Sequence, residues 1–165
     1  MERVGGHWQA TDAVICGDVT VGEDCSFWFQ TVARGDVAAI RIGKRTNIQE
    51  HVVLHCDTGK PLEIGDDVTI GHGAIVHCSK VGSRSLIGMK AVLLGDCVIG
   101  EDCVIAAGAV LSPGTVVPDG QVAMGVPARV VRATREAERE FVRENGAHYI
   151  ALARDHSEHP EKYYR

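Results

Sequence analysis

The sequence lacks the segments that membrane insertion or secretion requires. No apolar run approaches the roughly 18 residues of a membrane span, and residues 1–14 lack the apolar stretch of a secretory signal. Basic residues are in the minority, because 17 Lys and Arg stand against 22 Asp and Glu, a formal net charge of -5. This balance gives no basic surface for nucleic acid or for an anionic membrane. We therefore expect a cytoplasmic protein that binds neither.

Cysteine pairs and aromatic residues are scarce as well. The six cysteines form no Cys-x-x-Cys motif, which suits a reducing compartment better than a disulfide framework. Only three Phe, two Trp and three Tyr are present, against 19 Gly. The core must therefore consist of aliphatic side chains, with many tight turns between them. At 165 residues, the chain is expected to form one core rather than a multi-domain assembly.

An aliphatic or small side chain returns every six residues through the second half of the chain. An amphipathic helix needs apolar residues three and four apart, and a half-buried strand alternates by two, so neither explains this period. A parallel β-helix does explain it, because each hexapeptide forms a short strand and a turn, and three hexapeptides close one coil. The predicted inward positions are Val81, Ile87, Leu93, Ile99, Ile105, Leu111, Val117 and Ala123.

The same repeat runs out of phase through the first half, and each phase change marks an irregular segment. Segments 34–41 and 56–62 interrupt the repeat, and it is one residue short before Val81. In a solenoid such irregularities lie on the outside and commonly carry function.

The C-terminal part changes to a helical pattern. Apolar residues there recur at helical spacing with Glu and Arg between them, and Gly146 within this stretch leaves open a kink or an end of the helix. We therefore predict a β-helix over residues 1–132 and a C-terminal α-helix with a tail over 133–165, packed on an outer face.

Three of the eight histidines stand at related positions of the repeat. Counting faces places His55 and His77 just after inward residues of the same face, in adjacent coils. Their imidazoles then stack about 4.8 Å apart along the axis and point outward. Two imidazoles this close can share one metal ion at the zinc–nitrogen distance of about 2.0–2.1 Å.

The three faces of the coils form a triangular prism. His72 lies on the preceding face of the same coil as His77, so a corner of this prism separates it from the pair. If three prisms pack around a threefold axis, His72 of one copy completes a site with His55 and His77 of another. Three histidines with an open fourth position are typical of catalytic zinc, with Fe(II) or Co(II) as alternatives. Without metal, they would be ordinary surface or packing histidines. Cys56 and Cys78 leave a weaker option of soft ligation or an oxidative bond.

The histidines belong to a longer ordered series of short motifs. The motifs are Arg34-Gly35-Asp36, Ile42-Gly43, Thr46-Asn47-Ile48-Gln49-Glu50, Val53-Leu54-His55, Ile64-Gly65, Val68-Thr69-Ile70-Gly71-His72, Ile75-Val76-His77 and Leu86-Ile87-Gly88-Met89. Over most of the chain this series resembles the gamma-class carbonic anhydrases and their close relatives. The resemblance implies a left-handed β-helix and a homotrimer with three metal sites between subunits.

The resemblance also implies roles for residues around the metal. Gln49 and Asn47 would lie beside it, with Gln49 hydrogen-bonded to the bound water, and Tyr149 would approach it from the C-terminal helix. Arg34 and Asp36 would form ionic contacts across the subunit boundary. Each role has a plainer alternative. Asn47 could support a turn, Tyr149 could pack the helix, and the two charged residues could form an exposed pair worth little energetically.

Two positions depart from the family pattern. Glu50 stands where the family usually has Asp, which keeps the charge. The segment 56–62 is short, with Asp57 as its only acidic residue, whereas the family prototype carries an extended acidic loop with a proton-shuttling glutamate. Asp57, Glu50 and the solvent buffer are therefore the candidate proton acceptors.

Together these features predict a zinc-dependent carbonic anhydrase, a lyase that reversibly hydrates CO2 to bicarbonate. Zinc acidifies its bound water to a pKa of about 7, and the resulting hydroxide attacks CO2. Ligation needs neutral imidazoles, so metal affinity and activity should fall at acid pH. Three alternatives stay open: an acyltransferase with a histidine base, a metal-dependent acyl-CoA thioesterase, and a trimeric scaffold that keeps the metal without turnover.

Overall fold

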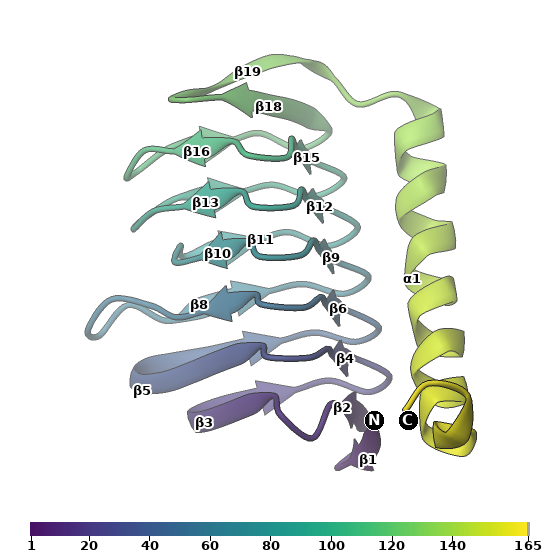
Figure 1. The fold of residues 1–165 in the computed structure, drawn as a ribbon. Coiled ribbons are helices and arrows are strands. Elements are labelled where there is room, and N and C mark those ends of the chain that lie inside the picture. Colours follow the sequence, from purple (N-terminus) through teal and green to yellow (C-terminus); the bar gives the residue numbers. More distant parts are fainter. Residues whose placement is uncertain (165) are drawn as a thin grey trace.

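The computed structural model describes residues 1–164, which wind into a stack of short strands with one long helix at its side (Figure 1). Strands within the stack pair in parallel, and the pairs at its two ends are antiparallel. The elements are β1 (Glu2–Val4), β2 (His7–Gln9), β3 (Val14–Val21), β4 (Ser26–Phe27), β5 (Val32–Ile42), β6 (Asn47–Ile48), β7 (Val53–Leu54), β8 (Leu62–Ile64), β9 (Thr69–Ile70), β10 (Ile75–Val76), β11 (Lys80–Val81), β12 (Leu86–Ile87), β13 (Val92–Leu93), β14 (Val98–Ile99), β15 (Val104–Ile105), β16 (Val110–Leu111), β17 (Val116–Val117), β18 (Gln121–Gly125), β19 (Ala128–Ala133), α1 (Glu136–Glu158) and the 3-10 helix η1 (Pro160–Lys162).

The parallel strands form three faces around an aliphatic core. The helix face consists of β4, β6, β9, β12 and β15; the valine face of β7, β10, β13 and β16; and the charged face of β8, β11, β14 and β17. Strands β3 and β5 turn the corner between the last two faces and belong to both. All eight inward positions predicted from the period are buried, which confirms the repeat. Because burying a Leu or Ile side chain contributes about 1.5–3 kcal/mol, these stacked positions dominate the stability of the solenoid.

The irregular segments of the repeat meet at the corner between the valine face and the charged face. The register of β3 against β5 shifts so that Val19 pairs with Ile40, and residues 36–39 bulge outward. The connection between β7 and β8 touches this bulge, because the Gly59 amide donates a hydrogen bond to the Val37 carbonyl. Residues 36–39 and 57–61 therefore lie on the outside, as expected for a solenoid, whereas Ile40, Cys56 and Leu62 of the same segments belong to the core.

Helix α1 runs along the helix face as one unbroken element (Figure 1). The kink or end that the sequence left open at Gly146 does not occur, and Gly146 is buried in the middle of the helix. The first turn is fixed by the Glu138 carboxylate, which accepts hydrogen bonds from the Arg135 backbone and the Arg132 guanidinium. The helix contacts strands β4, β6 and β9. This packing outweighs the low helix propensity of one glycine.

The structure confirms the predicted fold class, a mainly β parallel β-helix of hexapeptide repeats with a C-terminal α-helix. Strand β19 ends at Ala133 and helix α1 begins at Glu136, close to the boundary expected at residue 132. Among the described residues, no helix is both long enough and apolar enough to cross a membrane.

Candidate metal centre

His55 and His77 lie side by side at the edge of the valine face. Strands β7 and β10 pair so that Leu54 is opposite Val76, and each histidine follows its strand directly. The two imidazole centroids are 5.2 Å apart, as the face count requires. Both rings are partly exposed, so they are open to a ligand rather than used as core packing.

Charged side chains surround this pair. Arg34 donates to the Asp36 carboxylate, and Asp36 Oδ1 lies 3.1 Å from His55 Nε2. Arg34 Nη2 lies 3.5 Å from His55 Nδ1, and the guanidinium holds the pKa of Asp36 below its usual range. Asp57 Oδ1 is 3.9 Å from His77 Nε2. Arg34 and Asp36, expected to act across a subunit boundary, thus pair within one chain beside His55.

His72 follows strand β9 on the helix face, away from the other two histidines. Its Nδ1 lies 2.5 Å from Glu50 Oε2, and its Nε2 has no hydrogen-bond partner among residues 1–164. A carboxylate behind an imidazole is the arrangement that orients metal-ligating histidines. The sequence held a signal for this contact, because Ile48 is in register with Ile70 and the residues two positions later therefore stack.

Within the described part of one chain, no three His, Cys, Asp or Glu side chains come close enough to hold a metal ion. The donor set nevertheless fits a metal. Two imidazoles are neighbours, and a third is oriented by a carboxylate with one ring nitrogen left for a ligand. Neutral imidazole nitrogens are ligands that Zn2+ and similar ions prefer.

A chain of buried polar side chains lies next to His72. Gln49 Nε2 donates to Asn47 Oδ1 at 3.1 Å, and Asn47 Nδ2 donates to Thr69 Oγ1 at 2.8 Å. Asn145 of helix α1 donates to the same Thr69 oxygen at 3.2 Å. Asn47 is therefore part of strand β6 and of this network, and the alternative that it supports a turn is wrong. Thr69 and Asn145 were missed from the sequence because neither residue type is distinctive alone.

A cavity of about 320 Å3 opens between the helix face and helix α1. Gln49 and His72 contribute to its wall, which is otherwise mainly apolar and includes Ile87, Ile105 and Phe141. A small apolar molecule can therefore lie beside the candidate ligand His72.

Tyr149 takes part in both the cavity and the packing of the helix. It lines the cavity, and its ring packs edge-on against Trp28 with centroids 5.3 Å apart. Partial burial, with a smaller effect from the Glu50 charge, raises the pKa of the Tyr149 hydroxyl. Its two expected roles are thus compatible.

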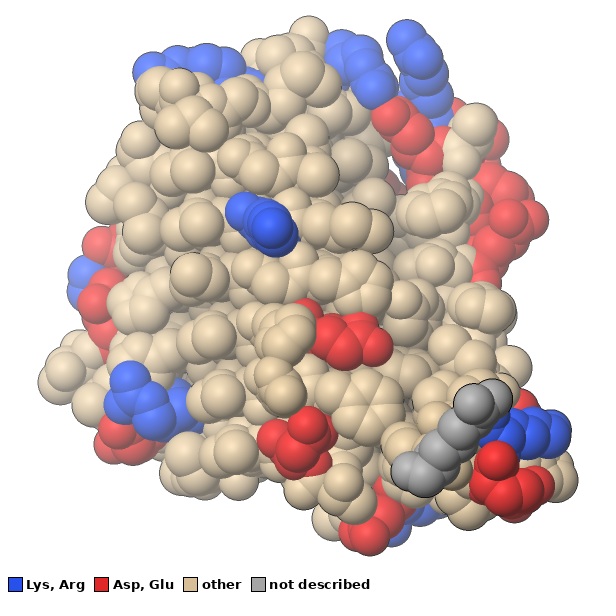
Figure 2. All heavy atoms as spheres, in the orientation of Figure 1, with Lys and Arg blue, Asp and Glu red and all other residues tan. Residues whose placement is uncertain are grey.

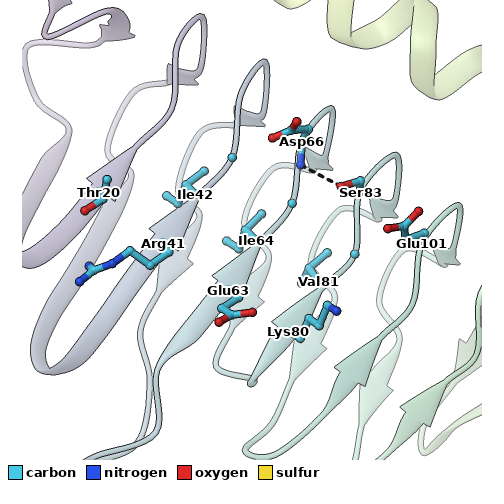
Figure 3. A pocket seen from close by; sticks show the side chains of 13 residues that line it. Thr20, Arg41, Ile42, Glu63, Ile64, Asp66, Lys80, Val81, Ser83 and Glu101 are labelled. Atoms are coloured by element: carbon cyan, nitrogen blue, oxygen red, sulfur yellow. Dashed lines mark hydrogen bonds between the residues drawn. The ribbon is translucent and has the colours of Figure 1, made fainter.

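A larger hollow, of about 460 Å3, lies on the charged face (Figure 3). Arg41, Glu63 and Lys80 stand on adjacent strands there, and Asp18 engages Arg41 at 2.7 Å. None of the described residues that line it is a histidine or a predicted site residue. Size alone does not identify the functional site.

The cysteines give little support to ligation by sulfur. All six are free, and both Cys56 and Cys78 are buried. Burial raises the pKa of Cys56, and it raises the pKa of Cys78 to about 12. Because only the thiolate is a good metal ligand, these side chains act as small core residues.

Comparisons with known proteins show which chains this one is similar to. The family model described as dynactin subunit 5 matches residues 1–151. A probable carbonic anhydrase from Methanocaldococcus jannaschii is 51% identical over 144 residues, covering 87% of this chain and 91% of that protein. A carbonic anhydrase from Geobacillus kaustophilus is 47% identical over 146 residues, covering 84% of this chain and 80% of that protein.

A solved structure shares the fold. The crystal structure of a hexapeptide transferase family protein from Anaplasma phagocytophilum has a TM-score of 0.86 and 37% sequence identity, covering 92% of this chain and 89% of that one. From these matches and the ordered motifs around the three histidines, the chain belongs to the gamma-class carbonic anhydrase family.

Proposed function

We propose that the protein is a zinc-dependent carbonic anhydrase that reversibly hydrates CO2 to bicarbonate. The observation that carries this proposal is the disposition of the three histidines. His55 and His77 are neighbours at 5.2 Å, and Glu50 orients His72 with a ring nitrogen left for a ligand. Fe(II) or Co(II) can replace zinc in such a donor set, because histidine nitrogens discriminate weakly between these ions.

The complete site requires a second copy of the chain, and we propose a homotrimer. Residues 1–164 of one chain bring no three metal donors together, whereas His72 of one copy can join the pair of a neighbour. The valine face supports this assembly, because its outward positions form an apolar ladder beside His55 and His77. The ladder consists of Val14, Val32, Val53, Ile75, Val92 and Val110.

The apolar ladder of the valine face is exposed to solvent in the single chain. Val14, Val53 and Ile75 are 49%, 37% and 41% exposed, so the single chain leaves a continuous apolar strip in solvent. Figure 2, in the orientation of Figure 1, shows few charged side chains over strands β10, β13 and β16. A strip of this kind marks a protein–protein contact.

The residues around the metal site have separate roles in the reaction. When bound, zinc supplies a water acidified to a pKa of about 7, the nucleophile for CO2. Gln49 presents an amide to this water, and Asn47 holds that amide at 3.1 Å. The apolar wall of the cavity favours CO2 over bulk water next to the site. We place the protein in the cytoplasm, because six unpaired thiols suit a reducing compartment.

Acyl transfer or thioester hydrolysis is the second candidate. The cavity of about 320 Å3 exceeds the volume of CO2, and a structural neighbour is named a hexapeptide transferase. The neighbouring pair His55 and His77, with His72 oriented by a carboxylate, nevertheless favours ligation, because an acyltransferase needs only one free histidine as base.

Metal analysis of the purified oligomer, paired with stopped-flow CO2 hydration and acyl-CoA hydrolysis assays, tests the proposal. We expect bound metal and CO2 hydration in the wild type, with both lost in His77→Ala. His51→Ala is the matched control, because His51 is an exposed histidine at a turn outside the site. Metal without turnover would favour the scaffold, and full activity without metal would refute the mechanism.

A further inference from the structure

Two residues outside the proposed catalytic set, Thr69 and Asn145, complete the hydrogen-bond chain behind Gln49. Thr69 pairs in register with Asn47 on neighbouring strands, so their side chains stand together on the helix face. Thr69 Oγ1 accepts one hydrogen bond from Asn47 and one from Asn145 of helix α1. Asn47, Gln49 and Thr69 are all less than 5% exposed, so water competes little for these groups.

The hydrogen bonds of this network fix which end of each side-chain amide donates and which accepts, starting from Asn145 on the helix. A side-chain amide can present either its NH2 group or its carbonyl oxygen, and its partners decide which. Because Asn47 gives its NH2 to Thr69, its carbonyl faces Gln49 and accepts from the Gln49 NH2. The Gln49 carbonyl oxygen has no partner within residues 1–164, and Gln49 lines the cavity.

We propose that Thr69 and Asn145 are positioning residues that make Gln49 present its carbonyl oxygen, and not its NH2 group, to the cavity beside His72. An oxygen there accepts a hydrogen bond from a water or hydroxide, whereas an NH2 group would donate to one. The orientation therefore selects which lone pair of the nucleophile stays free for CO2. This role rests on the proposed function, because Gln49 orients a water or hydroxide only if the protein hydrates CO2.

The contact from Asn145 also couples the helix to the site. Asn145 lies in the middle of α1, one residue before the buried Gly146. Asn47 lies on strand β6 and Thr69 on strand β9, and the helix contacts both strands. Docking of the helix thus becomes a condition for a correctly oriented Gln49.

The experiment uses two pairs of variants. Thr69→Val removes the hydroxyl, whereas Thr69→Ser keeps it. Asn145→Ala removes the contact from the helix, and Glu144→Ala, on the exposed side of the helix, is its control. The first readout is hydrogen exchange of the Asn47 and Gln49 side-chain NH2 groups by NMR on metal-free protein. We expect exchange to become about tenfold faster in Thr69→Val and to stay near wild type in Thr69→Ser.

The second readout is the kinetics of CO2 hydration on metal-loaded protein. We expect kcat to fall about tenfold in Thr69→Val and Asn145→Ala, at unchanged metal content and KM, with Thr69→Ser and Glu144→Ala near wild type. Unchanged exchange in Thr69→Val, or a Thr69→Ser variant as impaired as the valine, would overturn the positioning role. A wild type without CO2 hydration would refute the proposed function, while the exchange result would still decide whether Thr69 holds the Asn47 and Gln49 amides in place.

Discussion

At the scale of single residues, the candidate site depends on pairs as much as on ligands. Glu50 and His72 stack because their strands are in register, and the carboxylate fixes the Nδ1 side of the ring. A free imidazole rotates and samples both tautomers, whereas a paired one is ready to bind with Nε2. Glu50 is thus an orienting partner for a ligand, whereas the sequence suggested a retained charge and a candidate proton acceptor.

Removing this carboxylate should weaken metal binding. We expect Glu50→Ala to lower metal affinity about 10–100-fold, because His72 loses its orienting acceptor, while Glu50→Asp keeps most of the affinity. Competition with a chelator of known affinity measures the change. Glu63→Ala, on the charged face, is the matched control. Equal affinity in Glu50→Ala and wild type would contradict the assignment of His72 as a ligand.

A second residue, His7, should make stability depend on pH. It is buried at the first coil with its Nε2 unpartnered among the described residues, and burial lowers its pKa from 6.5. As the pH falls, the unfolded chain therefore binds the proton before the folded one does. The free energy of unfolding should decrease as the pH falls below about 6.5, and level off once the folded pKa is passed.

The variant His7→Phe isolates this contribution. Phenylalanine keeps the edge contact to Phe27, now 5.7 Å between centroids, and cannot titrate. Urea unfolding at fixed protein concentration should show a smaller loss of stability for His7→Phe than for wild type between about pH 7 and pH 5. An equal decrease in the free energy of unfolding of the two proteins would show that groups other than His7 cause the loss of stability at acid pH.

At the scale of elements, glycine has opposite meanings in the helix and in the coils. A methyl group on Gly146 would meet no atom within 4 Å beyond its own stretch of helix. A methyl group on Gly82 would lie 2.5 Å from the Gly100 backbone of the next coil. The first glycine only weakens its element, whereas the second permits two coils to stack.

The same substitution should therefore have opposite effects at the two sites. We expect Gly146→Ala to raise the free energy of unfolding by about 0.5–1 kcal/mol, because alanine is the better helix former and space is available. Gly82→Ala should lower it by about 1–3 kcal/mol through backbone displacement. Urea titrations with unchanged slopes would measure both. A destabilised Gly146→Ala would mean that the helix needs that space for closer packing.

The extent of sequence-based prediction follows from the same physics. A period of six is written into every coil, so the inward ladder and the stacked His55 and His77 could be predicted by counting. Whether the helix breaks at Gly146 could not be decided from the sequence, because helix propensity ignores the surface on which the helix packs. The Thr69 network was invisible, since it joins a strand to a helix 76 residues later. Positions in a local repeat can be inferred from the sequence, whereas contacts between polar residues far apart in the chain become visible only in the structure.

At the scale of the whole molecule, the apolar ladder of the valine face should control assembly and metal binding together. Ile75→Asp places a charge in the middle of this ladder, and burying it between copies is costly. We expect the oligomer to dissociate in light scattering and the bound metal to be lost. Val116→Asp, an outward position 60% exposed on the charged face, should change neither. A monomeric Ile75→Asp that keeps its metal would contradict a site shared between chains.

Complementation between inactive variants tests the shared site most directly. His72→Ala lacks the ligand lent to a neighbour, and His77→Ala lacks one of the pair that receives it. When the two variants are coexpressed, an interface is intact only where a His77→Ala copy lends His72 to a His72→Ala copy. Random assembly makes about a quarter of the interfaces intact, so metal content and CO2 hydration should return to about a quarter of wild type. A site built within one chain has no such route, because every copy then lacks a ligand and the mixture stays as inactive as each variant alone.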